Sequence, residues 1–303
     1  MKRRDFLKRG ISVGFIAGTA FTINPYKLGA ASASGNYDMV AIKGGSASSM
    51  FDRAIEEYGG MRSIVRKGQN VVIKPNIGWD ASPERAANTN PKLIGRIVEH
   101  CKSAGAKNVY VFDHTCNEWT KCYSNSGIED AVKKAGGKMV MGNSEKYYQD
   151  VDVPKGKSLK SAEVHELILE SDVFINVPVL KNHGGANMTV SMKNLMGIVW
   201  DRGYWHRNDL HQCIADFSTW REPDLTVVDA YRVMKRNGPR GVSVEDVVTM
   251  KSQLLGKDMV ALDTAAIKLF GKDPSEVDYV DLAEQAGVGS GNLQDMNIAR
   301  IKV

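Results

Sequence analysis

Residues 176–197 read NVPVLKNHGGANMTVSMKNLMG, and this stretch organises the expectations for the whole chain. It begins inside an apolar run, Val173–Val177, that has the length and composition of a buried strand in a parallel sheet. Sites in parallel α/β sheets form at the carboxyl ends of strands. Lys181, Asn182 and His183 fall just beyond that end, and two glycines follow them. The stretch therefore indicates an α/β protein with a polar site beside this strand.

A short helix is expected after the two glycines. Asn187 is a suitable N-cap for it, and Lys193 and Asn194 would lie on the helix. Lysine, histidine and asparagine side chains suit an anion or a metal-bound oxyanion. The alternative is a solvated strand-to-helix loop with ordinary lysines, because a short motif is weak support for a site on its own.

The rest of the chain alternates predicted strands and helices. Strands are expected at 39–42, 70–74, 108–112, 138–141, 173–177, 225–229 and 297–303, with a further β element at 247–254. Helices are expected at 46–58, 92–103, 127–135, 162–170, 209–220, 265–270 and 275–286. Strands separated by helices favour right-handed crossovers, so we predict one α/β domain over residues 34–303, with a mostly parallel sheet and flanking helices.

Polar residues follow several of the expected strands. Those at or just beyond a strand end are Lys74, Asn76, Trp79, Asp113, His114 and Asp229. Parallel strands place these ends on one edge of the sheet. A common pocket is therefore predicted for Lys74, Asp113, Lys181, His183 and Lys193. Burying so many cations without counter-charge is costly, so the cluster implies a bound anion, a metal with anionic ligands, or the nearby aspartates.

The predicted chemistry depends on lysine and histidine. The lysines would neutralise developing negative charge, and His183 or His114 would serve as metal ligand or proton carrier. The residues assigned to catalysis are His183, Lys181, Lys193 and Asp113. Those assigned to substrate binding are Lys74, Asn76, Asn182, Asn194 and Trp79. Asp229 and Asp263 are candidate ligands or histidine-orienting groups, with the capping of following turns as the alternative.

The number and spacing of the cysteines do not identify a cofactor. The four are Cys101, Cys116, Cys122 and Cys213, and no pair has the C-x2-C spacing of a self-contained iron-sulfur motif. Cys116 and Cys122 are close enough in sequence for a loop disulfide, and free thiols are also compatible with the spacing. With His114 the same two cysteines would form a metal site, so a bound metal of unknown identity is the sharper alternative.

The N-terminus has the pattern of an export signal. Arg3 and Arg4 precede a modest apolar segment at 11–23 and a small-x-small cleavage site at 31–33. This pattern predicts a twin-arginine signal over residues 1–33, with the twin-arginine translocon as partner and a periplasmic or otherwise exported location. An uncleaved membrane anchor needs roughly 20 strongly apolar residues, whereas polar residues and glycines interrupt this segment.

Removal of residues 1–33 also changes the charge. Of 40 basic and 35 acidic residues, six basic and one acidic lie in that segment, which leaves 34 of each. No basic excess remains to support binding of nucleic acid.

Seven short motifs together resemble a known family. They are KPNIG at 74–78, Asp113-His114, NVPVLKNH at 176–183, SMKNLMG at 191–197, VVDA at 227–230, LD at 262–263 and AEQAGVG at 283–289. The chain beyond residue 33 is similar throughout to domain-of-unknown-function family 362 of bacteria and archaea. Many of those relatives carry a ferredoxin-type region with closely spaced cysteines, which this sequence lacks. The central block is also similar to nickel-dependent lactate racemase-like proteins, where lysine and histidine hold a pincer cofactor, and no expectation here depends on that second likeness.

The resemblance implies a fold and a site, since the family has no settled reaction. Our first hypothesis is an exported metal- or cofactor-binding enzyme that acts on a small anionic or carbonyl substrate. In one version of this hypothesis the chemistry is redox-linked and a redox partner protein takes part. The second is a periplasmic ligand-binding or cofactor-delivery protein that uses the same residues without catalysis.

Overall fold

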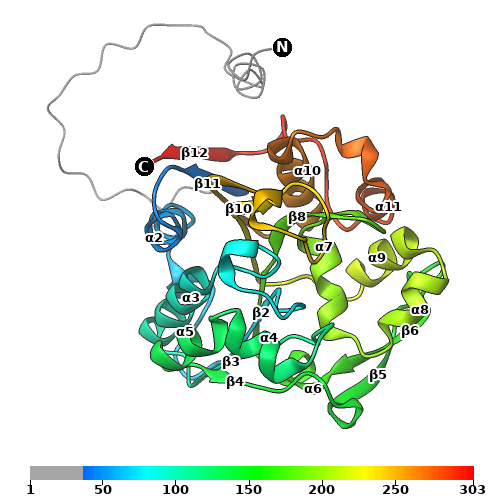
Figure 1. Cartoon of the computed structure of the whole chain (residues 1–303), viewed down its shortest axis with the longest axis horizontal. Coiled ribbons are helices and arrows are strands. Elements are labelled where there is room, and N and C mark those ends of the chain that lie inside the picture. Colours follow the sequence, from blue (N-terminus) through cyan, green and yellow to red (C-terminus); the bar gives the residue numbers. More distant parts are fainter. Residues whose placement is uncertain (1–36) are drawn as a thin grey trace, which may run out of the picture. The chain divides into compact units, whose positions relative to one another are not determined.

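The computed structural model describes residues 37–303, and a mixed β-sheet runs through their centre (Figure 1). In spatial order its main strands are β12 (Ile298–Lys302), β1 (Met39–Lys43), β11 (Val247–Gly256), β10 (Leu225–Met234), β7 (Val173–Val177), β2 (Asn70–Pro75), β3 (Asn108–Val111) and β4 (Lys138–Met139). The strands from β10 to β4 run parallel to their neighbours, as do β12 and β1, whereas β11 is antiparallel to both of its neighbours. The sheet is therefore mostly parallel, as the alternation in the sequence predicts.

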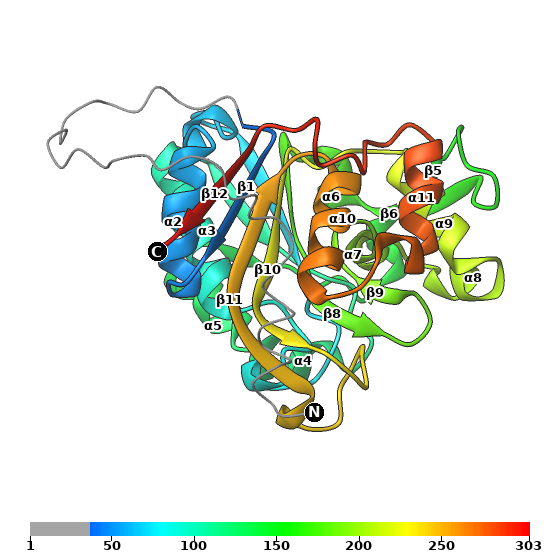
Figure 2. The ribbon, with the colours of Figure 1, turned by 90° about the horizontal axis from the view of Figure 1, so that it is seen from above.

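Helices cover both faces of this sheet (Figure 2). One face carries α2 (Ala47–Glu57), α3 (Pro91–Ala104) and α5 (Ile128–Lys134). The other carries α7 (Ser191–Asn194), α9 (Leu210–Ser218), α10 (Met259–Phe270) and α11 (Asp278–Gln285). Each helix layer has its own apolar core against the sheet, so the described chain is a three-layer α/β/α structure.

Strand β2 contributes side chains to the apolar cores on both faces of the sheet. Val71 and Ile73 are buried in the core on the α2 and α3 side, and Val72 is buried in the core on the α10 side. Side chains alternate between faces along a strand, so Lys74 falls on the same face as Val72. That is the face covered by α7, which carries Lys193.

The segment after β7 differs from the prediction. The sequence predicts a loop at 181–183 followed by a helix capped by Asn187. The structure instead has a hairpin: β8 (Val179–His183) pairs parallel with β10, and β9 (Asn187–Thr189) returns antiparallel to β8. Asn187 has a φ of 60°, a left-handed conformation that asparagine tolerates, and it begins the return strand. The helix starts four residues later, at Ser191.

A second prediction fails at 162–170, where the sequence indicates a helix. Residues Ser161–His165 form β6, which pairs with β5 (Tyr148–Asp152) in a small separate sheet, and the helix α6 is confined to Glu166–Glu170. Pairing with β5 overrides the helical propensity of the segment. His165 is fully buried and not on the surface; its Nδ1 accepts a hydrogen bond from the Leu167 amide, and its ring stacks on Tyr147.

The predicted signal at residues 1–33 lies outside the described residues. Within residues 37–303, no helix combines the length and the apolar character that crossing a bilayer requires. The shorter helices α4 (Trp119–Asn125) and α8 (Arg202–Arg207) lie beside the carboxyl ends of the parallel strands, next to the site described below.

Candidate functional site

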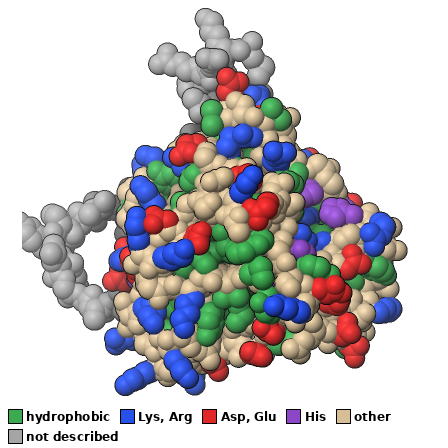
Figure 3. All heavy atoms as spheres, turned by 60° about the horizontal axis from the view of Figure 1, so that its bottom comes forward, with side chains coloured by type: hydrophobic (Ala, Val, Ile, Leu, Met, Phe, Trp, Pro, Cys, Tyr) green, Lys and Arg blue, Asp and Glu red, His purple; other side chains and the backbone are tan. Residues whose placement is uncertain are grey.

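One cleft gathers the residues that the sequence predicts to converge. It has a volume of about 70 Å³ and lies where β2, β3 and β7 end. Its charged and polar lining residues are Lys74, Asn76, Asp113, His114, Cys116, Lys181, His183, Thr189, Lys193, Asn194 and Arg202, with Trp79 beside them. We call it the lysine cleft. Figure 3 shows histidine side chains beside lysine or arginine side chains on one face of the molecule.

Lys74 and Asp113 form the buried ion pair of the lysine cleft. Lys74 is 1 % exposed, and its Nζ lies 3.0 Å from Asp113 Oδ1. The other carboxylate oxygen, Oδ2, accepts a hydrogen bond of 2.7 Å from the Ile77 amide. Burial lowers the pKa of Lys74, and the charge of Asp113 opposes that shift. Removing one member would leave the other as an uncompensated buried charge.

Gly197 makes room for this pair. A Cβ atom at Gly197 would lie 1.8 Å from Asp113 Oδ1 and 2.6 Å from Lys74 Nζ, far inside van der Waals contact. Gly197 belongs to the SMKNLMG motif, and its carbonyl also accepts a hydrogen bond from the His114 amide. The glycine of this motif is therefore required by the close approach of the ion pair to the backbone.

Asn194 holds the buried polar groups in place. Its Oδ1 accepts hydrogen bonds from Lys74 Nζ at 2.9 Å and from Asn76 Nδ2 at 3.0 Å. Its Nδ2 donates to Asn176 Oδ1 and to the Lys74 carbonyl. The amide of Asn194 is thereby fully engaged with protein groups. Asn76 and Asn194 line the cleft, where they position the lysines, and their role in substrate binding stays a prediction.

Lys181 and Lys193 differ in their partners. Lys181 is 1 % exposed, and its Nζ donates to the Ala87 carbonyl and to Asn76 Oδ1 at 3.2 Å. Burial lowers its pKa to about 7. Lys193 is half-buried, and its Nζ has no hydrogen-bond or ion-pair partner within residues 37–303. Burial is also the main cause that lowers the pKa of Lys193 to about 8.

The two histidines of the cleft are fixed in opposite tautomers. Nδ1 of His183 accepts hydrogen bonds from the amides of Gly185 and Ala186, at 3.1 and 3.0 Å. A backbone amide can only donate, so the neutral ring carries its proton on Nε2. Nδ1 of His114 faces the Val199 carbonyl at 3.0 Å and must donate to it, which leaves a lone pair on Nε2.

Both histidines are neutral at pH 7. Burial and the charges of Lys193 and Lys181 lower the pKa of His183 to about 2. Burial and the charge of Arg202 lower that of His114 to about 4. His183 is therefore a hydrogen-bond donor through Nε2, and this corrects its prediction as metal ligand or proton carrier. His114 has a free basic nitrogen and is stacked on Trp200, with ring centroids 4.8 Å apart.

Sequence reasoning missed two further residues of the cleft, Arg202 and Thr189, and considered Cys116 only as a metal ligand or disulfide partner. Arg202, in α8, donates to the carbonyls of His114 and Thr115, and its Nη1 lies 3.6 Å from Cys116 Sγ. The hydroxyl of Thr189 is buried without a partner in the described chain. Cys116 is exposed, so the cleft opens to solvent there. Arg202 belongs to the polar WDRGYWH segment, which was the available signal; nothing in the sequence marks Thr189.

Some predicted site residues lie elsewhere. Asn182 points its Oδ1 at the Gly238 amide and does not line the cleft. Asp229 accepts hydrogen bonds from the amides of Asn90 and Tyr231. The oxygens of Asp263 accept from the first two amides of α7, so Asp263, and not Asn187, caps that helix. Both aspartates therefore accept hydrogen bonds from backbone amides outside the cleft, and burial raises their pKa values, to about 6 for Asp229 and about 7 for Asp263.

The predicted metal ligands His114, Cys116 and Cys122 do not form a ligand set. Cys122 is fully buried with its Sγ toward the Gly78 carbonyl, and burial raises the pKa of its thiol to about 11. All four cysteines are free thiols. Nowhere in residues 37–303 do three histidine, cysteine, aspartate or glutamate side chains gather at a distance that suits a metal ion. The charged side chains of the cleft are four cations and one carboxylate, a set that suits an anion better than a metal cation.

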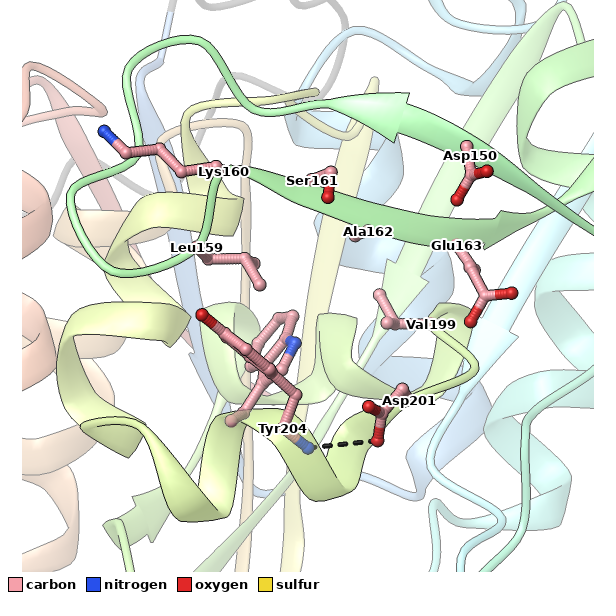
Figure 4. Close-up of a pocket in the computed structure, with 10 residues that line it drawn as sticks. Asp150, Leu159, Lys160, Ser161, Ala162, Glu163, Val199, Asp201 and Tyr204 are labelled. Atoms are coloured by element: carbon pink, nitrogen blue, oxygen red, sulfur yellow. Dashed lines mark hydrogen bonds between the residues drawn. The ribbon is translucent and has the colours of Figure 1, made fainter.

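A larger pocket, drawn in Figure 4, is lined by other residues of α8 and its N-terminal flank. It has a volume of about 300 Å³ and lies between the β5–β6 hairpin and the start of α8. Its lining carboxylates are Asp150, Glu163 and Asp201, so we call it the acidic pocket. Burial and then the neighbouring carboxylates raise the pKa of Glu163. Asp201 Oδ1 accepts a hydrogen bond of 3.0 Å from the Tyr204 amide and thereby caps α8.

Comparison with known proteins identifies the family. Residues 71–268, which include every charged residue of the lysine cleft, match the family described as Domain of unknown function (DUF362). The chain belongs to this family. Its members share a description that names no reaction, so the geometry of the cleft has to carry the functional argument.

Individual relatives are distant. The thylakoid-associated protein sll1697 of Synechocystis is 24% identical over 256 residues, which covers 82% of this chain and 77% of that protein. Among solved structures, the lactate racemase apoprotein of Thermoanaerobacterium thermosaccharolyticum matches with a TM-score of 0.42 and 16% identity, over 70% of this chain and 53% of that one. A Thermotoga maritima protein matches with a TM-score of 0.45 and 10% identity, over 79% and 58%. The chain thus spans little more than half of either solved chain.

Proposed function

We propose that this protein is an enzyme that acts on a small organic anion, a carboxylate with a carbonyl or hydroxyl group beside it. The observation that carries the proposal is the charge of the lysine cleft. Lys74, Lys181, Lys193 and Arg202 line it, and Asp113 is its sole carboxylate among the described residues. Lys74 is paired with Asp113, but Lys181 and Lys193 have no carboxylate partner in the described chain. Buried cations are costly unless they are paired, and a bound anion would supply the missing negative charge.

The size of the cleft restricts the part of the substrate that it holds. About 70 Å³ is room for a few water molecules at roughly 10–15 Å³ each, which matches a carboxylate and the group next to it. The rest of a longer substrate would extend toward the solvent-exposed side at Cys116. The orphaned hydroxyl of Thr189 supplies a further donor for the anion.

The residues present support proton transfer beside a stabilised oxyanion. Lys181 and Arg202 would hold the carboxylate, and the Nε2–H of neutral His183 would donate to an oxygen on which charge develops. The free Nε2 of His114 would take or return a proton at the neighbouring carbon or oxygen, since a low histidine pKa keeps it available as a base at pH 7. In this scheme neutral His183 acts as the hydrogen-bond donor and neutral His114 as the proton acceptor.

Calorimetric titration of the purified chain with oxalate, pyruvate and lactate tests the binding part of the proposal. We expect binding of these carboxylates and none of simple amines of equal size. Incubation with lactate and pyruvate in D2O then tests for turnover, with deuterium at the carbon next to the carboxylate followed by NMR. Carboxylate binding without deuterium exchange would favour a ligand-binding protein over an enzyme. If no carboxylate binds, both the enzyme and the ligand-binding protein are excluded.

We also propose that the chain is exported by the twin-arginine route, because Arg3, Arg4 and the segment that follows fit such a signal. The double substitution Arg3→Lys with Arg4→Lys should leave the precursor in the cytoplasm of an expressing cell. Efficient periplasmic accumulation of that variant, detected by fractionation, would refute the proposal.

A further inference from the structure

The three lysines of the cleft are chemically distinct. Lys74 is paired with the Asp113 carboxylate, which holds it as a cation. Lys181 donates to two neutral oxygens, of Ala87 and Asn76, which occupy its N–H groups. Lys193 has neither kind of partner within the described chain. Its amine is thus the one lysine nitrogen of the cleft that no protein group engages.

The backbone that carries Lys193 is held rigidly. Lys193 is the third residue of α7, and the two amides before it, of Ser191 and Met192, donate to the carboxylate of Asp263 at 2.8 and 3.2 Å. Asp263 is fully buried, and Asn194, the next residue, is locked by its four hydrogen bonds to neighbouring groups. A fixed main chain with a free amine at its end is the arrangement that a positioned nucleophile requires.

We propose, on the basis of the function above, that Lys193 is a covalent nucleophile and that the substrates are small 2-oxo acids. The carboxylate of the oxo acid would lie among Lys181, Arg202 and the Thr189 hydroxyl. Its carbonyl carbon would face the amine of Lys193, and its carbonyl oxygen would accept a hydrogen bond from the Nε2–H of His183, which keeps its proton. The product of this step is an imine, which draws electrons away from the neighbouring carbon.

The step balances without any added oxidant or reductant. The amine nitrogen of Lys193 bonds to the carbonyl carbon, and the π pair of the C=O bond moves to oxygen. Nitrogen loses one proton and oxygen gains one, which gives a carbinolamine. The hydroxyl takes a second proton and leaves as water while the nitrogen lone pair closes the C=N bond. Overall, one lysine ammonium and one ketone give one protonated imine and one water. Nε2 of His114, which lines the same cleft, would carry the protons.

The environment of Lys193 supplies the neutral amine that this step needs. Burial lowers its pKa to about 8. Cys116 and Asp113 oppose this shift, and Arg202 and Lys74 act in the same direction as burial. About a tenth of such an amine is neutral at pH 7, compared with about one part in 3,000 for an ordinary lysine. The electrostatic environment therefore favours Lys193 over the exposed lysines of the chain by roughly two orders of magnitude.

Reductive trapping tests the inference. The full chain would be incubated at pH 7 with pyruvate and sodium cyanoborohydride, which reduces an imine to a stable secondary amine. Intact mass spectrometry should show one adduct per chain, and peptide mapping should place it on Lys193. The substitution Lys193→Arg keeps the positive charge but cannot form an imine, so it should abolish the adduct. Lys155→Arg, at an exposed lysine outside the cleft, should leave it unchanged.

Binding measured without the reductant separates this inference from the proposed function. Oxalate has no ketone, so its binding tests the anion site alone, and Lys193→Arg should retain it within about threefold. If oxalate and pyruvate bind but the adduct is absent, or is spread over exposed lysines and survives Lys193→Arg, the imine is refuted and the anion site stands. If neither carboxylate binds, the proposed function itself is wrong.

Discussion

The lysine cleft and the acidic pocket are both lined by residues at the start of α8, and they differ in size, charge and burial. The acidic pocket is about four times larger, at about 300 Å³ compared with about 70 Å³. Its carboxylates are solvated, since Asp150 is exposed and the Asp201 side chain is 54% exposed. In the lysine cleft, Lys74 and Lys181 are each 1% exposed.

The difference shows that burial of charge is a better guide to a site than volume. Solvated carboxylates near a hairpin cost little free energy and are common on protein surfaces. Two almost fully buried lysines cost much more, because the surrounding protein cannot replace their hydration. The architecture agrees, since the lysine cleft lies at the carboxyl ends of the parallel strands, whereas the acidic pocket lies beside a separate two-stranded sheet.

The largest effect is expected from Gly197→Ala in the lysine cleft. The new Cβ would lie 1.8 Å from Asp113 Oδ1, so the buried ion pair with Lys74 must separate. We expect a loss of about 2–4 kcal/mol in the free energy of unfolding, measured by urea denaturation. Gly184→Ala is the matched control, because its nearest contact would be at an ordinary 3.7 Å. Equal effects of the two substitutions would contradict the tight packing of the cleft.

Next in size is the effect of Lys181→Met on anion binding. Loss of one buried charged donor costs about 1.5–3 kcal/mol, so the affinity for oxalate should fall by about 10–100-fold. Lys160→Met, the same change in the acidic pocket, should alter it by less than about twofold. Calorimetry measures the oxalate affinity of both variants. A similar loss of affinity in both would mean that general surface charge, and not the cleft, attracts the anion.

A smaller effect is expected from pH, and it has opposite signs for stability and for binding. The pKa of Lys181 is about 7 in the folded protein and ordinarily 10.5, so between these values the unfolded chain binds more protons. Unfolding free energy should therefore rise from pH 7 to pH 9, by about 1–2 kcal/mol. Affinity for oxalate should fall over the same range, because the cleft lysines lose their charge.

Lys181→Met supplies the control for the pH prediction. Without the titrating amine, the rise in stability between pH 7 and pH 9 should be reduced in denaturation experiments, while the wild-type chain keeps it. A rise of the same size in both proteins would assign the effect to other groups.

The convergence of the site could be predicted from sequence because it depends on topology. Lys74 lies near the carboxyl end of β2, and Asp113 and Lys181 follow β3 and β7; the β-branched composition of these strands is evident, and parallel pairing brings their ends together. Those same strand patterns establish the mostly parallel sheet. Local composition and one handedness rule were sufficient for this part.

The details of the site depend on contacts that leave no mark on the local sequence. The donor tautomer of His183 results from amides two and three residues later that fold back in a hairpin, where the sequence predicts a loop followed by a helix. Arg202 reaches the cleft from a separate helix to bond carbonyls 87 and 88 residues away. The strand β6 exists because β5 pairs with it, although its sequence continues into a helical pattern.

The smallest effect is expected from Glu163→Gln in the acidic pocket. Burial and the neighbouring carboxylates raise the pKa of Glu163, so its charged form is disfavoured in the folded state. Because the side chain is partly solvated, removing its charge should raise stability by no more than about 0.5 kcal/mol at low salt. Screening should abolish the gain at about 1 M salt, where the Debye length is about 3 Å. Thermal unfolding at both salt concentrations measures this, and oxalate affinity should stay at the wild-type value throughout. If Glu163→Gln changed oxalate affinity as strongly as Lys181→Met, the lysine cleft and the acidic pocket would act as one electrostatic site, and the anion site would not be confined to the buried lysines.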